Sequence, residues 1–127
     1  MNYYSTRDHQ QIVSAAQAIA CGLAPDGGLF VPESLPEVPA QQLQALCGMT
    51  YQQRAVTIMR PFLSEFTDAE LERFTAAAYG SQFDDPAVAP VHRLDDTTAF
   101  LELWHGPTCA FKDMALQILP YLLTASL

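Results

Sequence analysis

Apolar residues recur at helical spacing in several stretches of the chain, and polar residues that favour a helix start precede them. The Thr-x-x-Gln motif at 50–53 and the Thr-x-x-Glu motif at 67–70 have the spacing of capping boxes, and each predicts the start of a helix. The same reasoning places an earlier helix start at the Asp-x-x-Gln motif of 8–11, with Gly22 as its stop. The residues expected to line the apolar faces of these helices are Ile12, Ala16, Ile19, Tyr51, Ala55, Ile58, Phe62, Leu71, Phe74 and Ala78.

Shorter apolar stretches between turn-forming residues are typical of strands. Residues 2–6 and 29–31 are expected to form two of them, and a tight turn at 25–28, Pro-Asp-Gly-Gly, precedes the second. Residues 91–94 and 98–104 flank an Asp-Asp-Thr turn, which predicts a hairpin. Because helices predominate and the strands are short, the predicted fold class is α+β.

Charge and composition exclude several classes of protein. The chain has 127 residues, 50% of them hydrophobic, which suits one domain with a packed core. The formal net charge is −8, and the six Lys and Arg residues are scattered, so neither nucleic acid nor an anionic membrane surface is an expected partner. No run of about 18 apolar residues occurs, and the first twenty residues lack a secretory pattern, so a cytoplasmic location is expected.

The cysteines point to a reducing compartment. Cys21, Cys47 and Cys109 are odd in number and widely spaced, which does not suit a disulfide framework. No histidine lies at ligand spacing from any of them, so no metal site is expected.

Residues 102–117, ELWHGPTCAFKDMALQ, contain Lys112, the only lysine of the sequence. This lysine segment joins a strand to an apolar helix through a Gly-Pro turn, so Lys112 is expected in or just before the first helical turn. A buried amine in such a place loses its proton more easily, and a neutral amine condenses with an aldehyde to form a Schiff base. An ordinary solvated lysine beside Asp113 is the alternative, and chemistry alone favours it.

Three segments of the chain together resemble threonine synthase, which uses pyridoxal 5′-phosphate (PLP). They are YYSTR at 3–7, GLAPDGGLFVP at 22–32 and HGPTCAFKDMALQ at 105–117, in the order of that family. The last is the most specific. Trp104, Cys109 and Met114 stand where other apolar residues are expected, but the His-Gly-Pro-Thr and Phe-Lys-Asp cores are intact.

The resemblance implies a fold type II PLP enzyme that converts O-phospho-L-homoserine and water to L-threonine and phosphate. Lys112 would be its catalytic and cofactor-binding residue and Phe111 would contact the cofactor, although an ordinary packing role is an equal alternative for Phe111 and for His105. Residues 1–90 would form the N-terminal domain, and residues 91–127 would begin the PLP-binding catalytic domain. The resemblance also implies a longer protein, because a phosphate-binding loop and a partner for the pyridine nitrogen are not seen here.

Two alternative functions remain open for the chain. The chain is either part of a threonine-synthase-like phospho-lyase with another phosphorylated hydroxy-amino acid as substrate, or a non-catalytic domain that docks through its C-terminal helix. That helix, expected from Phe111 onward with a kink at Pro120, is apolar on almost every side. Without covering strands, residues 111–127 are expected either to drive self-association of the 127-residue chain or to fray. The chain alone should be inactive and not stably bound to PLP.

Overall fold

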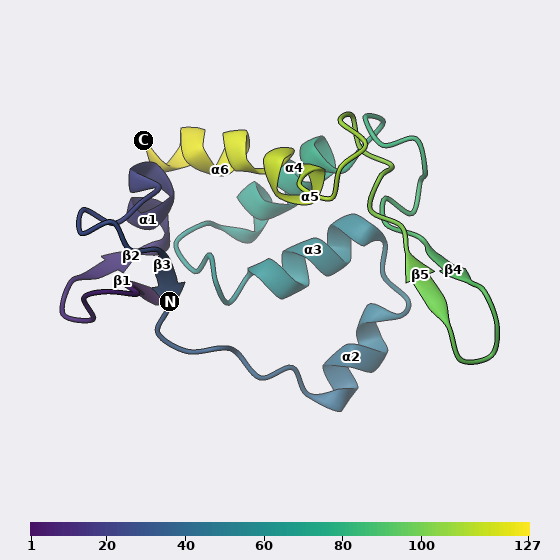
Figure 1. Ribbon diagram of the computed structural model, residues 1–127, viewed down its shortest axis with the longest axis horizontal. Helices are drawn as coiled ribbons and strands as arrows, with labels where there is room; N and C mark the ends of the chain where they lie inside the picture. The colour runs from purple at the N-terminus through teal and green to yellow at the C-terminus, as the bar shows by residue number, and fades with distance from the viewer.

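The computed structural model describes residues 1–127, in which two small antiparallel sheets lie at opposite sides of a group of helices (Figure 1). The strands are β1 (Asn2–Ser5), β2 (Ile12–Ser14), β3 (Phe30–Pro32), β4 (Val91–Arg93) and β5 (Ala99–Leu101). The helices are α1 (Ala15–Cys21), α2 (Ala40–Leu46), α3 (Tyr51–Met59), α4 (Asp68–Ala78), α5 (Asp113–Leu116) and α6 (Leu119–Ser126). The α+β class is confirmed. None of these helices has both the length and the apolar character needed to cross a membrane.

The first sheet has the strand order β2-β1-β3, and it corrects the predicted start of the first helix. Residues 12–14 form the edge strand β2, in which Val13 pairs with Tyr3 of β1, because β-branched residues suit a pleated strand better than a helix end. Helix α1 begins only after Ser14, whose hydroxyl accepts a hydrogen bond from the backbone N–H of Gln17 at 3.2 Å. Gly22 ends the helix with a positive φ of 76°, as predicted.

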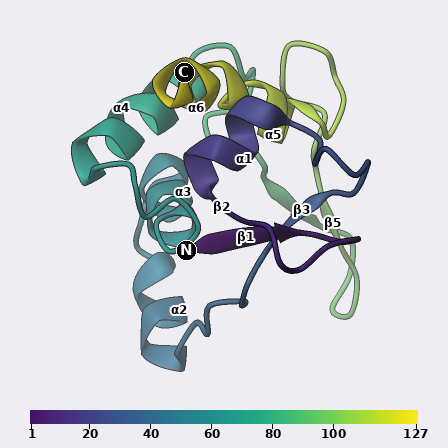
Figure 2. The same cartoon turned by 90° about the vertical axis from the view of Figure 1, so that its left-hand side faces the viewer.

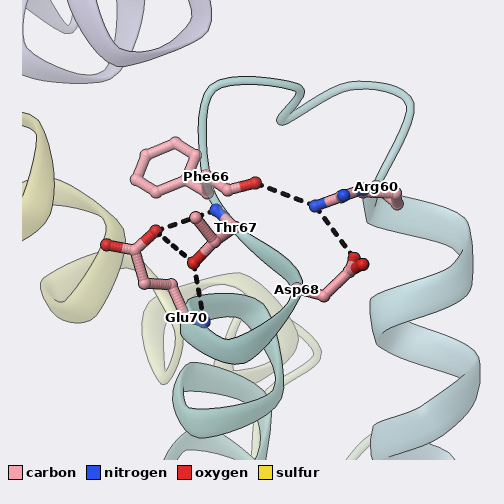
Figure 3. Close-up of polar contacts among 5 residues, drawn as sticks. All are labelled: Arg60, Phe66, Thr67, Asp68 and Glu70. Atoms are coloured by element: carbon pink, nitrogen blue, oxygen red, sulfur yellow. Dashed lines mark hydrogen bonds and ion pairs between the residues drawn. The ribbon is translucent and has the colours of Figure 1, made fainter.

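The starts of α3 and α4 confirm the predicted capping boxes. At α4, the Thr67 hydroxyl accepts from the Glu70 N–H at 3.3 Å, while a Glu70 carboxylate oxygen accepts from the Thr67 N–H at 2.8 Å (Figure 3). Arg60, at the end of α3, donates to the Phe66 carbonyl and forms an ion pair with Asp68, both at 2.9 Å. These contacts fix the turn between the two helices.

The core lies where α3 and α4 meet α1 and α6. Three predicted core residues of α4 are buried, with Leu71 at 0%, Phe74 at 4% and Ala78 at 0% exposure. The prediction is wrong for Ile12 and Ile58, which are 62% and 41% exposed, because Ile12 lies on the edge strand and Ile58 on the outer side of α3.

The apolar C-terminal segment folds as two helices instead of one kinked helix. Pro120 lies in the first turn of α6, where its missing N–H leaves no helical hydrogen bond unmade, so the chain breaks between α5 and α6. Helix α6 packs along α1 (Figures 1 and 2), and Ile118 and Leu122 enter the same core at 5% and 7% exposure. The expectation that the apolar side chains of residues 111–127 lack cover is therefore wrong for Leu122, although Leu116 and Leu119 are exposed.

The predicted hairpin is confirmed with shorter strands. β4 and β5 pair in antiparallel register, His92 opposite Phe100, and both strands are exposed along their whole length. In Figure 1 the hairpin projects from the helices, and its second strand leads directly into the lysine segment. The division into domains at residues 90 and 91 stays a prediction, since α6 shares its core with the elements before residue 90.

Candidate functional site

Lys112 occupies the place that the sequence predicts, immediately before α5. It is the N-cap residue of this four-residue helix, and its backbone already has helical dihedral angles, with φ −63° and ψ −17°. The Leu116 N–H donates to the Lys112 carbonyl at 2.8 Å, so the lysine backbone is part of the first turn. The lysine side chain is exposed and takes part in none of the ion pairs of the structure. The burial that would favour a neutral amine is therefore not provided by this chain alone.

Phe111 is the most exposed aromatic side chain of the lysine segment, at 72% exposure. Trp104, on the approach to the turn, is 51% exposed. An ordinary core role for Phe111 is thus excluded in these 127 residues. The structure leaves both an amine and an aromatic ring free beside the start of α5.

Asp113 differs from its two neighbours because it is completely buried, at 0% exposure. Its Oδ2 accepts hydrogen bonds from the backbone N–H and from the hydroxyl of Thr108, both at 2.9 Å. Burial raises the pKa of this carboxyl, but the hydrogen bonds from Thr108 act in the other direction and leave the pKa below its ordinary value. Asp113 is therefore an ionised group at neutral pH.

Gly106 packs directly against this carboxylate. It is buried, and a Cβ added to it would lie 2.6 Å from both the Cβ and the Oδ2 of Asp113. Any side chain at this position would displace the carboxylate, so the glycine is needed for close approach.

His105 lies between two carboxylates that come from different parts of the chain. Its Nδ1 is 2.6 Å from Asp84 and its Nε2 is 2.8 Å from Glu102. A neutral imidazole has only one N–H, so both contacts are hydrogen bonds only when the ring is protonated. The hydrogen bonds with Glu102 and Asp84 accordingly raise the pKa of His105. Asp84, in the loop that follows α4, thus forms an ion pair with the protonated His105.

Two tyrosines of the helical core hold α5 in place. The Tyr79 hydroxyl donates to the Met114 carbonyl at 2.7 Å, and the Tyr51 hydroxyl lies 3.4 Å from the Met114 sulfur. Tyr79 is 5% exposed, and burial followed by the charge effect of Tyr51 raises its pKa to about 12. The residue two positions after Lys112 is thus anchored to α3 and to the end of α4.

The structure brings together the other two segments that carried the resemblance. The Ser5 hydroxyl donates to the Asp26 carboxylate at 2.8 Å, and the Arg7 guanidinium donates to the Asp26 carbonyl at 3.0 Å. Gly27 has a positive φ of 76°, and its N–H and that of Gly28 are both already bonded within the turn. No hydrogen bond joins this turn to the lysine segment, so it stands apart from Lys112 in the hydrogen-bond network.

Sequence reasoning missed Asp113 and Tyr79 as parts of the site. An acidic residue in the first turn of a helix is a recognisable signal, and it pointed to Asp113 only as a surface partner of Lys112. Its burial depends on Gly106 and Thr108 folding back over it, which the order of residues does not reveal. Tyr79 carried no signal, because it acts on a carbonyl 35 residues away.

Comparisons with known proteins agree with this arrangement. Residues 2–79 match the family model described as the N terminus of threonine synthase. The threonine synthase of Pseudomonas aeruginosa is 41% identical over 124 residues, which cover 97% of this chain and 26% of that protein. Threonine synthase-like 1 of Macaca fascicularis is 38% identical over 91% of this chain and 16% of that protein.

A solved structure extends the match to the whole fold. The PLP-bound threonine synthase from Brucella melitensis superposes with a TM-score of 0.92 at 39% identity, over 99% of this chain and 27% of that chain. The fold and the lysine segment thus define the N-terminal part of a threonine synthase-type protein. The chain belongs to the threonine synthase family, and it spans about a quarter of the length of the threonine synthases that it matches.

Proposed function

We propose that this chain is the N-terminal part of a PLP-dependent threonine synthase that converts O-phospho-L-homoserine and water to L-threonine and phosphate. The observation that carries the proposal is the single lysine, exposed and unpaired at the start of α5, in a chain that matches PLP-bound threonine synthase over 99% of its length. The expected cellular location is the cytoplasm. The 127-residue chain alone is expected to be inactive.

The residues of this chain fit the aldehyde group of the cofactor but not its phosphate. An amine without an ion-pair partner is available to the PLP aldehyde, and Phe111 offers an exposed ring next to it in sequence. The glycine turn at 25–28 does not suit a phosphate, because the N–H groups of Gly27 and Gly28 are occupied within the chain. The contacts that hold the phosphate and the ring nitrogen therefore belong to the rest of the protein.

The chemistry divides between the cofactor and Lys112. When bound, PLP supplies an electron sink for charge that develops on the substrate carbons. Lys112 would hold the cofactor through its amine and, with that amine free, would move protons at the α and β carbons of the substrate. Phosphate would leave from the γ carbon, which would take up a proton, and water would add at the β carbon. On either side of Lys112, Asp113 binds Thr108 and Tyr79 binds the Met114 carbonyl.

Lys112→Ala in the full-length protein tests the proposal. We expect the visible absorbance of bound cofactor and the release of phosphate from O-phospho-L-homoserine both to be lost, because no other lysine exists in this part of the chain. Lys112→Arg is the matched variant, since it keeps the positive charge but cannot form the Schiff base. Near-wild-type turnover in either variant would exclude the proposed role of Lys112.

A threonine-synthase-like phospho-lyase is the second candidate, favoured by the 38% identity to threonine synthase-like 1. The two candidates differ in substrate. Phosphate release should be measured from O-phospho-L-homoserine, O-phospho-L-threonine and O-phospho-L-serine, with amino-acid analysis of the products. Threonine formed only from the first substrate supports the synthase, whereas release from the others without threonine supports the second candidate.

Self-association and docking through residues 111–127 both stay predictions. The burial of Ile118 and Leu122 in this chain removes part of the apolar surface that each would use. Leu116, Leu119 and Tyr121 remain exposed, at 43%, 42% and 39%. Light scattering of the 127-residue chain, compared with a Leu116→Gln, Leu119→Gln variant, measures how much association this surface supports.

A further inference from the structure

The carboxylate of Asp113 is buried with only one of its two oxygens hydrogen-bonded. Oδ2 has two donors, but the buried Oδ1 has no hydrogen-bond partner. Gln117, one helical turn further on, lies near enough to lower the pKa slightly but outside hydrogen-bond geometry. A buried acceptor without a donor is unfavourable, so the contact with Thr108 accounts for only one of the two carboxylate oxygens.

The hydrogen bonds of the Asp113 carboxylate close the loop that contains Lys112. Its bonds to Thr108 close a loop of residues 108–113, and Lys112 lies inside that loop. The Asp113 N–H donates to the Ala110 carbonyl at 3.0 Å, which tightens the same loop, and Gly106 packs against the carboxylate from outside. Thr108 is exposed, so water would satisfy its N–H and hydroxyl if the carboxylate were absent. The contact between Asp113 and Thr108 therefore matters more for the conformation of the 108–113 loop than for satisfying the polar groups of Thr108.

We propose that Asp113 is a positioning residue for Lys112: by binding Thr108, its carboxylate fixes the loop that presents the lysine amine to the cofactor. The inference rests on the proposed function of Lys112. Asp113 touches neither cofactor nor substrate in this proposal. It acts by limiting the backbone positions from which the amine can react, and a displacement of about 1 Å at a reacting group is enough to slow a reaction on the order of 100-fold.

Asp113→Asn in the full-length protein is the main test, because an amide is nearly the same shape but neutral. Its oxygen accepts weaker hydrogen bonds from Thr108 than the carboxylate does, and its NH2 group would replace the buried Oδ1, which has no partner. We expect PLP to attach to Lys112 about 10–100-fold more slowly, as measured by borohydride trapping and mass spectrometry at Lys112. The value of kcat should fall by a similar factor while KM changes by less than about twofold, since substrate binding is not altered. Amide hydrogen exchange of residues 106–112 should become faster, with the rest of the core unchanged.

A control and a second variant separate positioning from folding. Asp95 makes the same kind of contact, accepting from the N–H and hydroxyl of Thr97 at 2.8 and 2.9 Å in the exposed hairpin turn, so Asp95→Asn should leave all three readouts at Lys112 unchanged. Thr108→Val removes only the hydroxyl bond and should give a smaller effect in the same direction. In the Asp113→Asn background it should add nothing further, because the two residues act through one contact.

Three results would overturn the inference. The first is an unchanged trapping rate and unchanged exchange of residues 106–112 in Asp113→Asn. The second is a loss of activity that only follows the unfolded fraction at the assay temperature. The third, if Asp113→Asn does not fold, is wild-type behaviour of Thr108→Val. If wild-type Lys112 itself is not trapped by PLP, the proposed function fails instead, and the exchange of residues 106–112 still decides whether Asp113 holds the loop.

Discussion

The helix pair α3–α4 and the lysine segment lie side by side in the fold, yet they are built in different ways. The helix starts are satisfied by neighbours three residues away, as at Thr67 and Glu70, and the apolar face of α4 is almost fully buried. The lysine segment is held by partners far along the chain, such as Asp84 for His105 and Tyr79 for Met114. It also leaves large apolar side chains in solvent and a carboxylate in the interior. We therefore expect stability to be concentrated in the first region, and the chemistry that we propose to be concentrated in the second.

The largest expected difference between the two regions concerns a pair of phenylalanines. Phe74 in α4 is 4% exposed, so Phe74→Ala should lower the free energy of unfolding by about 3–5 kcal/mol. Phe111 is 72% exposed, so Phe111→Ala should change it by less than about 0.5 kcal/mol in the 127-residue chain. Urea unfolding of both variants measures this. A large loss for Phe111→Ala would show that the lysine segment contributes to stability after all.

A valine at Gly28 should have the next largest effect. Its Cβ would lie 2.1 Å from the Ser5 hydroxyl, which is buried and bonded to Asp26, so we expect a loss on the order of 1–2 kcal/mol. Gly27→Val should be destabilising for another reason, because Gly27 has a φ of 76° that a β-branched residue rarely adopts. Thermal melts measure both. Gly48→Val is the control, since the nearest atom to its added Cβ is 3.9 Å away, and equal midpoints for all three variants would contradict the prediction.

The capping box of α4 should contribute less than the buried core. Thr67→Ala removes an acceptor for the Glu70 N–H and is expected to lower the free energy of unfolding by about 1 kcal/mol. Thr57→Ala is the matched control, because the Thr57 hydroxyl contacts the Gln53 carbonyl and the Met49 sulfur and caps no backbone N–H. We expect that change to lie within about 0.5 kcal/mol of zero. If urea unfolding shows a larger loss of free energy for Thr57→Ala than for Thr67→Ala, the expected difference between a capping residue and an ordinary helix residue is wrong.

The smallest expected effect is a pH dependence in the lysine segment. Hydrogen bonds with Glu102 and Asp84 raise the pKa of His105 above its ordinary value of 6.5, so the folded state binds the proton more tightly than the unfolded chain. The stabilisation is fully present below pH 6.5 and is lost as the pH rises through the raised pKa. The melting temperature of the wild type should therefore fall more than that of His105→Gln between pH 6 and 9. His92→Gln, on the exposed strand β4, should follow the wild type, and parallel curves for wild type and His105→Gln would contradict the role of the two carboxylates.

The sequence predicted the helical region well because its determinants are local. The capping boxes at 50–53 and 67–70 and the buried face of α4 follow from spacings of three or four residues, and the structure confirms them. Prediction from the sequence was less reliable at residues 12–14, where a preference for a strand competes with a preference for a helix. There, pairing of β2 with β1 outweighs the helical spacing of Ile12 and Ala16.

At the candidate site, the sequence by itself determined the place of Lys112 before α5, the need for a turn at Gly106-Pro107 and the membership in a family. Only the tertiary structure decided that Lys112 and Phe111 are exposed whereas the adjacent Asp113 is buried. It also decided that His105 binds two carboxylates and that Tyr79 holds α5. The physical reason is distance along the chain: Asp84 and Tyr79 lie 21 and 35 residues from their partners, and no local propensity or periodicity records which side chains packing will bring together.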